Sequence, residues 1–327
     1  MKAFTIHCHM KPISCIEFSK ESDLLFISSK DSRCSVWYTK TGKMLGSYSC
    51  NGAINQISVN RACTRLLAAC GDYKLYIFDV KTGEKITEID QEAPVLGASF
   101  SLEGNKYFTI TRSFLGKASK LRVYESKNNK QIKEIYDSNI LPNVNMTCAV
   151  WGPLNKTIVV GYSDGKISLF DYESGKVLKT ITGHDLSIKK MQVNSRNDMF
   201  ITASEDKTAG LFNMRTLEKL KTFKISEIVN TAAFHPTKRH VLVGGGQASN
   251  ATQTGSKETF QAVHFFHSIF EKPIGAVKAH FSPVNAIAVS PDGKSYASGG
   301  EDGIIKYCLF DKDYLNMRDD AQSTLKF

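Results

Sequence analysis

The chain has 327 residues, 42% of them hydrophobic, and its formal net charge at pH 7 is +10. This is the composition of a globular protein, and no apolar run approaches the roughly 18 residues that span a membrane. The basic residues are dispersed along the chain, so a solvated basic surface is favoured over a groove for sequence-specific nucleic-acid binding.

The cysteines and the first residues indicate a cytoplasmic protein. The eight cysteines form no C-x-x-C pair and many lie in apolar runs, as reduced core residues do. The opening Met-Lys-Ala-Phe-Thr-Ile-His lacks the long apolar core of a signal peptide. His7, Cys8 and His9 suggest a metal site, but adjacent residues of a strand alternate faces. We therefore expect neither metal nor cofactor.

Acidic turns recur along the chain, each between a short apolar run and an alternating one, which is a hairpin signal. The turn acids are Asp31, Asp72, Asp164, Asp206 and Asp302. Three of them follow a histidine by 22 residues, and these histidines are His9, His184 and His280. The strands after the turns, with two that lack the acid, end at residues 38, 79, 125, 171, 213, 267 and 309. A period slightly above 40 residues is typical of WD repeats, whose unit is a four-stranded propeller blade.

The blades can be assigned in chain order. The first five are predicted at residues 13–48, 54–89, 95–135, 146–181 and 188–223. The third departs from the pattern, because it lacks the turn acid and has a longer loop at 112–120. The sixth begins at Ile228 and contains a polar segment, 247–258, which we expect to be a mobile or partner-ordered loop. The seventh is predicted at 284–310.

The residues before the first blade predict how the ring closes. Ala3 to Ile6 precedes His9 as Val177 to Ile181, the last strand of an interior blade, precedes His184. We expect this segment to be the fourth strand of the seventh blade, which removes the free edges of the ring. Although length alone favours about two domains, the repeat predicts one all-β domain. This is a seven-bladed propeller over 1–311, followed by a polar C-terminal tail over 312–327.

The histidines and turn acids predict hydrogen-bonded sets within the blades. A buried imidazole and a turn carboxylate both need partners. Thr202 and Ser298, each four residues before its aspartate, are the candidate hydroxyls. We expect a structural role. A catalytic triad is the alternative, but it is disfavoured because the set recurs in several blades, whereas an active site is needed once.

Sequence motifs of enzymes do not support catalysis. The chain has no Walker loop and no H-E-x-x-H. Gly244-Gly-Gly lacks the strand–helix context of a phosphate-binding loop. We therefore expect a protein that is not an enzyme, although propellers can carry active sites.

Several stretches are more specific than a generic propeller: Asp23-Leu-Leu-Phe26, Val36-Trp-Tyr38, Ala149-Val-Trp-Gly-Pro153, Phe200-Ile-Thr-Ala-Ser204, Gly244-Gly-Gly-Gln247, Phe265-Phe-His267, His280-Phe281, Pro291-Asp-Gly-Lys-Ser-Tyr296 and Ser298-Gly-Gly-Glu-Asp-Gly303. Through them the chain resembles, over nearly its whole length, subunit i of eukaryotic translation initiation factor 3. The resemblance implies a non-catalytic scaffold that binds a C-terminal helix of subunit b, and subunit g, on the small ribosomal subunit. The alternative is a generic WD-repeat adaptor in ubiquitin-ligase or signalling complexes.

A bound helix needs apolar anchors with a polar rim. We expect the fifth and sixth blades to supply this surface, where Phe223, Ile225 and Ile228 alternate with polar residues. These apolar residues are equally consistent with ordinary strand core. The candidate partner-binding residues are Asn213, Arg215, Lys224, Glu227 and, at the start of the polar loop, Gln247.

Overall fold

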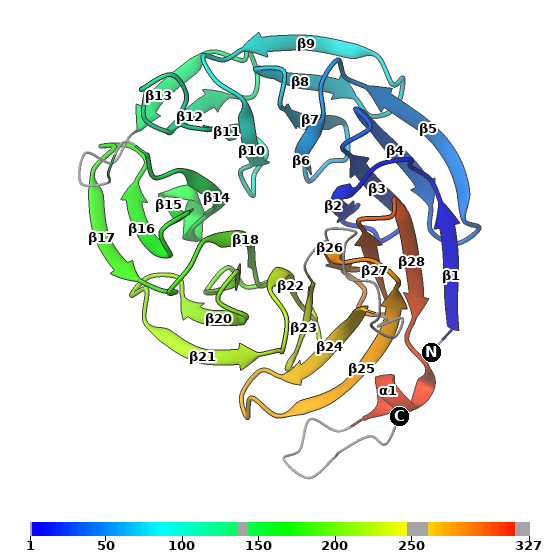
Figure 1. Ribbon diagram of the computed structural model, residues 1–327. Helices are drawn as coiled ribbons and strands as arrows, with labels where there is room; N and C mark the ends of the chain where they lie inside the picture. The colour runs from blue at the N-terminus through cyan, green and yellow to red at the C-terminus, as the bar shows by residue number, and fades with distance from the viewer. Residues whose placement is uncertain (1, 136–140, 142, 247–260, 318–327) are drawn as a thin grey trace, which may run out of the picture.

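The computed structural model describes residues 2–135, 141, 143–246 and 261–317. They form seven antiparallel sheets of four strands each, arranged as a ring (Figure 1). The first strand of each sheet faces the centre and the fourth lies at the rim. The predicted seven-bladed β-propeller is therefore confirmed.

The first three blades follow the chain in order. Blade 1 consists of β2 (Ile13–Phe18), β3 (Leu24–Ser29), β4 (Arg33–Tyr38) and β5 (Lys43–Ser49). Blade 2 consists of β6 (Ile54–Val59), β7 (Arg65–Cys70), β8 (Lys74–Asp79) and β9 (Lys85–Asp90). Blade 3 consists of β10 (Val95–Phe100), β11 (Lys106–Thr111), β12 (Lys120–Glu125) and β13 (Gln131–Ile135).

The next three blades repeat this order. Blade 4 consists of β14 (Met146–Trp151), β15 (Thr157–Tyr162), β16 (Lys166–Asp171) and β17 (Val177–Thr182), with a 3-10 turn, η1 (Pro153–Asn155). Blade 5 consists of β18 (Ile188–Val193), β19 (Met199–Ser204), β20 (Thr208–Asn213) and β21 (Lys219–Lys224). Blade 6 consists of β22 (Val229–Phe234), β23 (His240–Gly245), β24 (Gln261–His267) and β25 (Pro273–His280).

Blade 7 joins the two ends of the chain. Its sheet contains β26 (Val284–Val289), β27 (Ser295–Gly300), β28 (Ile304–Leu309) and, at the rim, β1 (Lys2–His7). β1 pairs with β28 from Lys2 opposite Leu309 to His7 opposite Ile304. The predicted closing strand is confirmed, and it is one residue longer at each end than the sequence pattern indicated.

The apolar core lies between the blades. The described buried residues form seven clusters, each joining two neighbouring blades. At the closing seam Ile6 of β1 packs against a cluster that contains Ile13 of blade 1 and Ile305 of blade 7. Each blade therefore shares its core with its neighbours, as expected for a propeller.

The innermost strand of every blade carries the same irregularity. In each one the pairing register shifts around the second residue, so that residue has no partner opposite, as in a β-bulge. The seven unpaired residues are Ser14, Asn55, Leu96, Thr147, Lys189, Asn230 and Asn285. All seven line cavities at the centre of the ring. The bulges therefore turn a mostly polar set of side chains into the central channel.

Two predicted segments differ from the regular blade. The longer loop of the third blade connects β11 with β12, and Phe114 and Lys117 form an isolated bridge within it. The polar segment 247–258 lies outside the described residues.

The first residues of the predicted polar tail form a short helix. Residues Lys312–Asn316 form α1, capped by Asp311, whose side chain accepts a hydrogen bond from the Tyr314 backbone. Tyr314 is only 1% exposed, and its hydroxyl lies 2.9 Å from Nδ1 of His240 in blade 6. Tyr314 thus anchors this segment to the propeller, together with the Met317 carbonyl, which accepts a hydrogen bond from Lys238 at 2.8 Å. Within the described ranges no helix is both long and apolar enough to cross a membrane.

Candidate functional site

The set in blade 5 is the most completely bonded of the predicted histidine sets. Nδ1 of His184 lies 2.8 Å from Asp206, and its Nε2 lies 2.6 Å from the Thr202 hydroxyl. Asp206 also accepts hydrogen bonds from the backbone N–H of Asp185 and from both the N–H and the hydroxyl of Thr208. Because a carboxylate only accepts, the imidazole proton lies on Nδ1. The set fastens the loop before β18 to the turn between β19 and β20.

The electrostatics of this set follow from its burial. Burial lowers the pKa of His184, and the Asp206 carboxylate opposes part of that shift. Burial would by itself raise the pKa of Asp206, but hydrogen bonds from Thr208 and the contact with His184 bring it below its usual value. The pair is therefore a neutral imidazole and an ionised carboxylate at neutral pH.

Blades 1 and 7 build the same set with different geometry. In blade 1 the hydroxyl comes from Ser35, 2.9 Å from Nε2 of His9, and Asp31 lies 2.8 Å from Nδ1. In blade 7 Ser298 lies 2.9 Å from Nε2 of His280, but Asp302 is 3.9 Å from Nδ1. The carboxylate of blade 7 is therefore beyond hydrogen-bonding distance.

Strand pairing explains why the hydroxyl comes from a residue before the turn aspartate in some blades and after it in another. The residue four before the turn aspartate lies directly opposite the residue four after it, as with Thr202 and Gly210 or Ile27 and Ser35. Only one of the two fits beside the imidazole. A Cβ placed on Gly210 would lie 3.0 Å from the Thr202 hydroxyl and 2.5 Å from the Phe212 ring. Ser35 occupies the later position, which the spacing shared by Thr202 and Ser298 does not indicate.

Asp72 and Asp164 do not belong to histidine sets. The Tyr76 hydroxyl, four residues after Asp72, donates directly to that carboxylate at 2.6 Å. Asp164 forms an ion pair with Lys166 at 2.9 Å. In blade 2 a single tyrosine therefore takes the place of the imidazole and the hydroxyl. A tyrosine four residues after the turn acid is the sequence signal for this arrangement.

The geometry does not suit nucleophilic catalysis. Thr202 and Ser298 are 0% exposed and Ser35 is 1% exposed, so their hydroxyls have no room beside them for a substrate. The same sets recur in three blades. We assign them the role of holding turns together, which keeps the loops on that face of the ring fixed.

The possible metal site at His7, Cys8 and His9 is occupied by other interactions. His9 is bound by Asp31 and Ser35, and the Cys8 thiol contacts the carbonyl of Gly303 at 3.7 Å. Burial raises the pKa of Cys8 to about 12, so it carries no thiolate at neutral pH. Among the described residues, no group of three or more His, Cys, Asp or Glu is placed to hold a metal ion.

A lysine links three blades across the central channel. Nζ of Lys190, on β18, donates to the carbonyl oxygens of Ser14 in blade 1 and Asn285 in blade 7, at 2.6 and 2.9 Å. Burial lowers the pKa of Lys190. The adjacent Lys189-Lys190 within the inner strand was the sequence signal for this contact, and it was missed.

The predicted partner residues divide between the two ends of one outer strand. Asn213 ends β20 and Arg215 lies in the turn before β21, where the Asn213 side chain accepts a hydrogen bond from the Arg215 N–H. Lys224 ends β21 and the exposed Glu227 follows it. Phe223 is buried against Phe266, and Ile225 packs on the same cluster. The apolar residues here are thus core rather than anchors. Gln247 lies outside the described residues.

Comparisons with known proteins cover nearly the whole chain. A family model described as EIF3I matches residues 1–320. "Eukaryotic translation initiation factor 3 subunit I" of Nematostella vectensis is 36% identical over 316 residues, which are 96% of this chain and 98% of that protein. The protein of the same name from Drosophila virilis is 38% identical over 94% of this chain and 97% of its own. That of Drosophila melanogaster is 37% identical over 96% and 98%.

Proposed function

The chain belongs to the family of subunit I of eukaryotic translation initiation factor 3, and from this premise we propose that it is a non-catalytic scaffold subunit of that factor. The observation that carries the proposal is the extent of the match, which includes all seven blades. The relatives' name supports a role in translation initiation. The buried hydroxyls of the histidine sets support a scaffold rather than an enzyme.

We take subunits b and g of the factor as the direct partners, with the small ribosomal subunit reached through the complex, in the cytoplasm. A rigid surface favours such assembly, because loops that are already ordered lose little entropy on binding. The histidine sets supply this rigidity on one face of the ring. Direct sequence-specific binding of nucleic acid is not part of the proposal.

The outer edge of blade 5 is the proposed site for a helix of subunit b. Leu220, on β21, lies where the pairing with β20 shifts register, and it is 38% exposed. The exposed Lys224 and Glu227 lie toward one end of this strand, and Arg215 lies beyond the other. An apolar residue between charged ends is the arrangement that an amphipathic helix requires.

The length of β21 sets how long a helix can lie against this edge. At about 3.4 Å per residue its six residues extend roughly 17 Å. A helix rises about 1.5 Å per residue, so some 11 residues span that distance. A helix of that length lying along β21 contacts Leu220 and Lys224, while Arg215 and Glu227 lie beyond its two ends.

Charge reversal tests this surface. The double variant Lys224→Glu with Glu227→Lys keeps the net charge but inverts the local pattern, so it should weaken binding of a helical peptide from subunit b by at least about tenfold. The matched control reverses the exposed Glu125 and Lys127 on blade 3. Calorimetric titration measures affinity, and thermal melts should superimpose. Unchanged affinity in the blade 5 variant would refute this site.

A further inference from the structure

The central channel ends in a cavity of about 400 Å³ on the face of the ring that carries the histidine sets. Lys30 and Glu301 line this cavity, and each directly precedes a turn acid of those sets, Asp31 or Asp302. The inner strands of blades 1, 2, 5, 6 and 7 supply most of the remaining lining. The volume lies within the roughly 300–1,000 Å³ typical of small-molecule sites. Because the outer edge of blade 5 takes no part in it, the cavity is independent of the proposed helix site.

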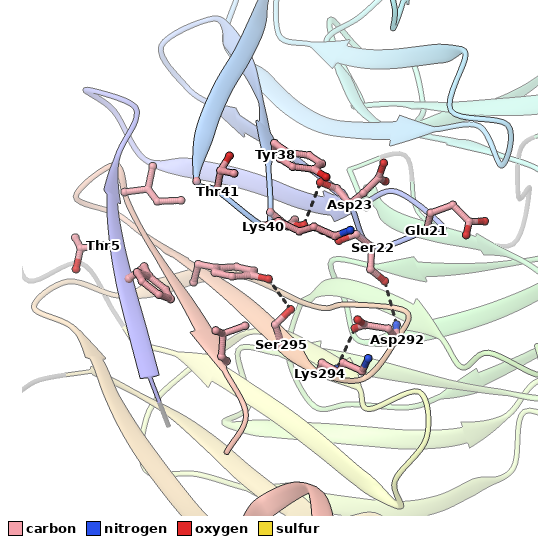
Figure 2. A pocket seen from close by; sticks show the side chains of 16 residues that line it. Thr5, Glu21, Ser22, Asp23, Tyr38, Lys40, Thr41, Asp292, Lys294 and Ser295 are labelled. Carbon is pink, nitrogen blue, oxygen red and sulfur yellow. Dashed lines mark hydrogen bonds between the residues drawn. The ribbon is translucent and has the colours of Figure 1, made fainter. Parts of the chain in front are cut away.

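Opposite charges offset one another in the groove between blades 7 and 1, which Figure 2 shows. Its charged lining residues are Lys40, Lys294, Glu21, Asp23 and Asp292. A ligand of either sign meets both attraction and repulsion there, so charge selects no occupant. The channel cavity differs from this groove, because positive charge predominates in its lining.

The charged lining of the channel cavity consists of three lysines and one carboxylate: Lys30, Lys189, Lys190 and Glu301. Lys189 forms an ion pair with Glu205, which is not part of the lining. The Asn285 amide donates to Oε2 of Glu301 at 2.5 Å, which holds this carboxylate on the blade 7 side. The ammonium groups of Lys30 and Lys190 therefore remain against one carboxylate, and the cavity keeps a net positive charge.

The ammonium group of Lys190 has no carboxylate partner within the described part of the chain. It donates to the carbonyl oxygens of Ser14 and Asn285, and its third hydrogen has no acceptor among the described residues. Lys30 is half-buried and donates to the Asn55 side chain, which leaves two hydrogens of its ammonium group. A buried charge is normally paired with an opposite one. An anion between the two lysines would provide that pairing.

The two lysines are close enough to repel each other. Burial lowers the pKa of Lys30, the Lys190 ammonium lowers it further, and Glu301 opposes part of the shift. Lys30 reaches the cavity from blade 1 and Lys190 reaches it from blade 5. An anion that lies between them is attracted from two sides and offsets their mutual repulsion.

We propose that the cavity at this end of the central channel binds a phosphate group, either inorganic phosphate or that of a small phosphorylated molecule. The ammonium groups of Lys30 and Lys190 donate to its oxygens from blades 1 and 5. A lysine ammonium is a compact point charge that binds phosphate well, whereas a planar carboxylate is better matched by the fork of an arginine. The described lining contains no arginine. Because Glu301 lines the same cavity, a single phosphate is favoured over a polyphosphate.

Calorimetric titration of the full chain tests the proposal, at neutral pH and at an ionic strength held constant with sodium chloride. Inorganic phosphate and glycerol 3-phosphate are the probes, and acetate is the carboxylate for comparison. Saturable binding of a phosphate probe is expected, with acetate weaker by about tenfold or more. Tighter binding of inorganic phosphate identifies the free ion as the ligand, and tighter binding of the ester identifies a phosphorylated molecule.

Matched variants locate the site. Lys30→Met removes one ammonium group and should weaken phosphate binding about tenfold, whereas Lys11→Met, at an exposed lysine of the loop before blade 1, should change it little. Glu301→Gln keeps the size of the side chain and removes the opposing charge, so it should strengthen binding about threefold. A damaged fold does not produce such a gain. The proposal is wrong if neither phosphate probe binds, if acetate binds equally, if Lys30→Met matches Lys11→Met, or if Glu301→Gln weakens binding.

Discussion

Replacing Asp206 with alanine should cost more stability than replacing Asp302, although both acids follow a histidine by the same spacing. Asp206 accepts four hydrogen bonds, from His184, from the Asp185 N–H and from two groups of Thr208. Asp302 accepts one from the Ile304 N–H, and it lies 3.9 Å from His280. The sequence alone predicts equal effects for the two substitutions.

The expected magnitudes follow from these contacts. A buried donor left unpaired costs about 1–3 kcal/mol, and an ordinary hydrogen bond contributes about 1 kcal/mol. The Thr208 hydroxyl lies 3.0 Å from Nδ1 of His184, so it can accept the imidazole N–H when the Asp206 carboxylate is removed. We therefore expect Asp206→Ala to lower the free energy of unfolding by about 2–3 kcal/mol, and Asp302→Ala by about 1 kcal/mol or less.

Urea unfolding of both variants measures the difference, with Asp185→Ala as the control. The Asp185 side chain is exposed and makes no hydrogen bond among the described residues, so its loss should change little. Equal losses for Asp206→Ala and Asp302→Ala would show that the hydrogen-bond geometry does not set the stability of the turns. A larger loss of unfolding free energy for Asp302→Ala than for Asp206→Ala would contradict the prediction.

Three further predictions concern the ring and its buried groups. Deleting residues 1–7 removes the rim strand β1 and exposes β28, so the protein should melt at lower temperature and aggregate; light scattering that matches the full chain would contradict this closure. Burial lowers the pKa of His280 to about 4, below the 6.5 of an unfolded histidine. The unfolded state then binds more protons between these values, so stability should fall by about 3 kcal/mol as pH drops from 6.5 to 4. Melting temperatures that stay flat over this range would exclude the effect. Tyr76→Phe leaves Asp72 without its 2.6 Å donor and should cost about 1–2 kcal/mol in urea unfolding, while Tyr38→Phe should be neutral.

The ring itself could be predicted from the sequence because a propeller is a repeat. The turn acids and strand ends return at nearly constant spacing, and each return marks one blade. The closing strand was predictable for the same reason, since Ala3 to Ile6 has the position of a fourth strand without a blade before it. Local pattern and global closure agree here, which makes such inferences dependable.

Side-chain partners were harder to predict because they depend on neighbours across the sheet. Thr202 was identified as the candidate hydroxyl from its distance to Asp206, but Ser35 fills that place from the adjacent strand in blade 1. Tyr314 was assigned to a polar tail, since one aromatic residue among charged ones gives no periodic signal. Phe223 alternates with polar residues as a surface anchor would, yet its ring is buried between blades 5 and 6.

The partner residues illustrate a further limit. Asn213, Arg215, Lys224 and Glu227 are near in sequence, but β21 separates the first two from the last two. Closeness in sequence does not show at which end of an outer strand each residue lies until the bounds of that strand are known. Once it is assigned, the four residues describe the length of an outer edge rather than a compact patch.

Affinity purification of the tagged chain from its own cells tests the central claim most directly. Quantitative mass spectrometry should recover subunits b and g of translation initiation factor 3 in near-equal amounts with the chain, together with small ribosomal subunits. The Lys224→Glu, Glu227→Lys variant should lose subunit b first. Recovery of ubiquitin-ligase or signalling components in place of these subunits would contradict the account.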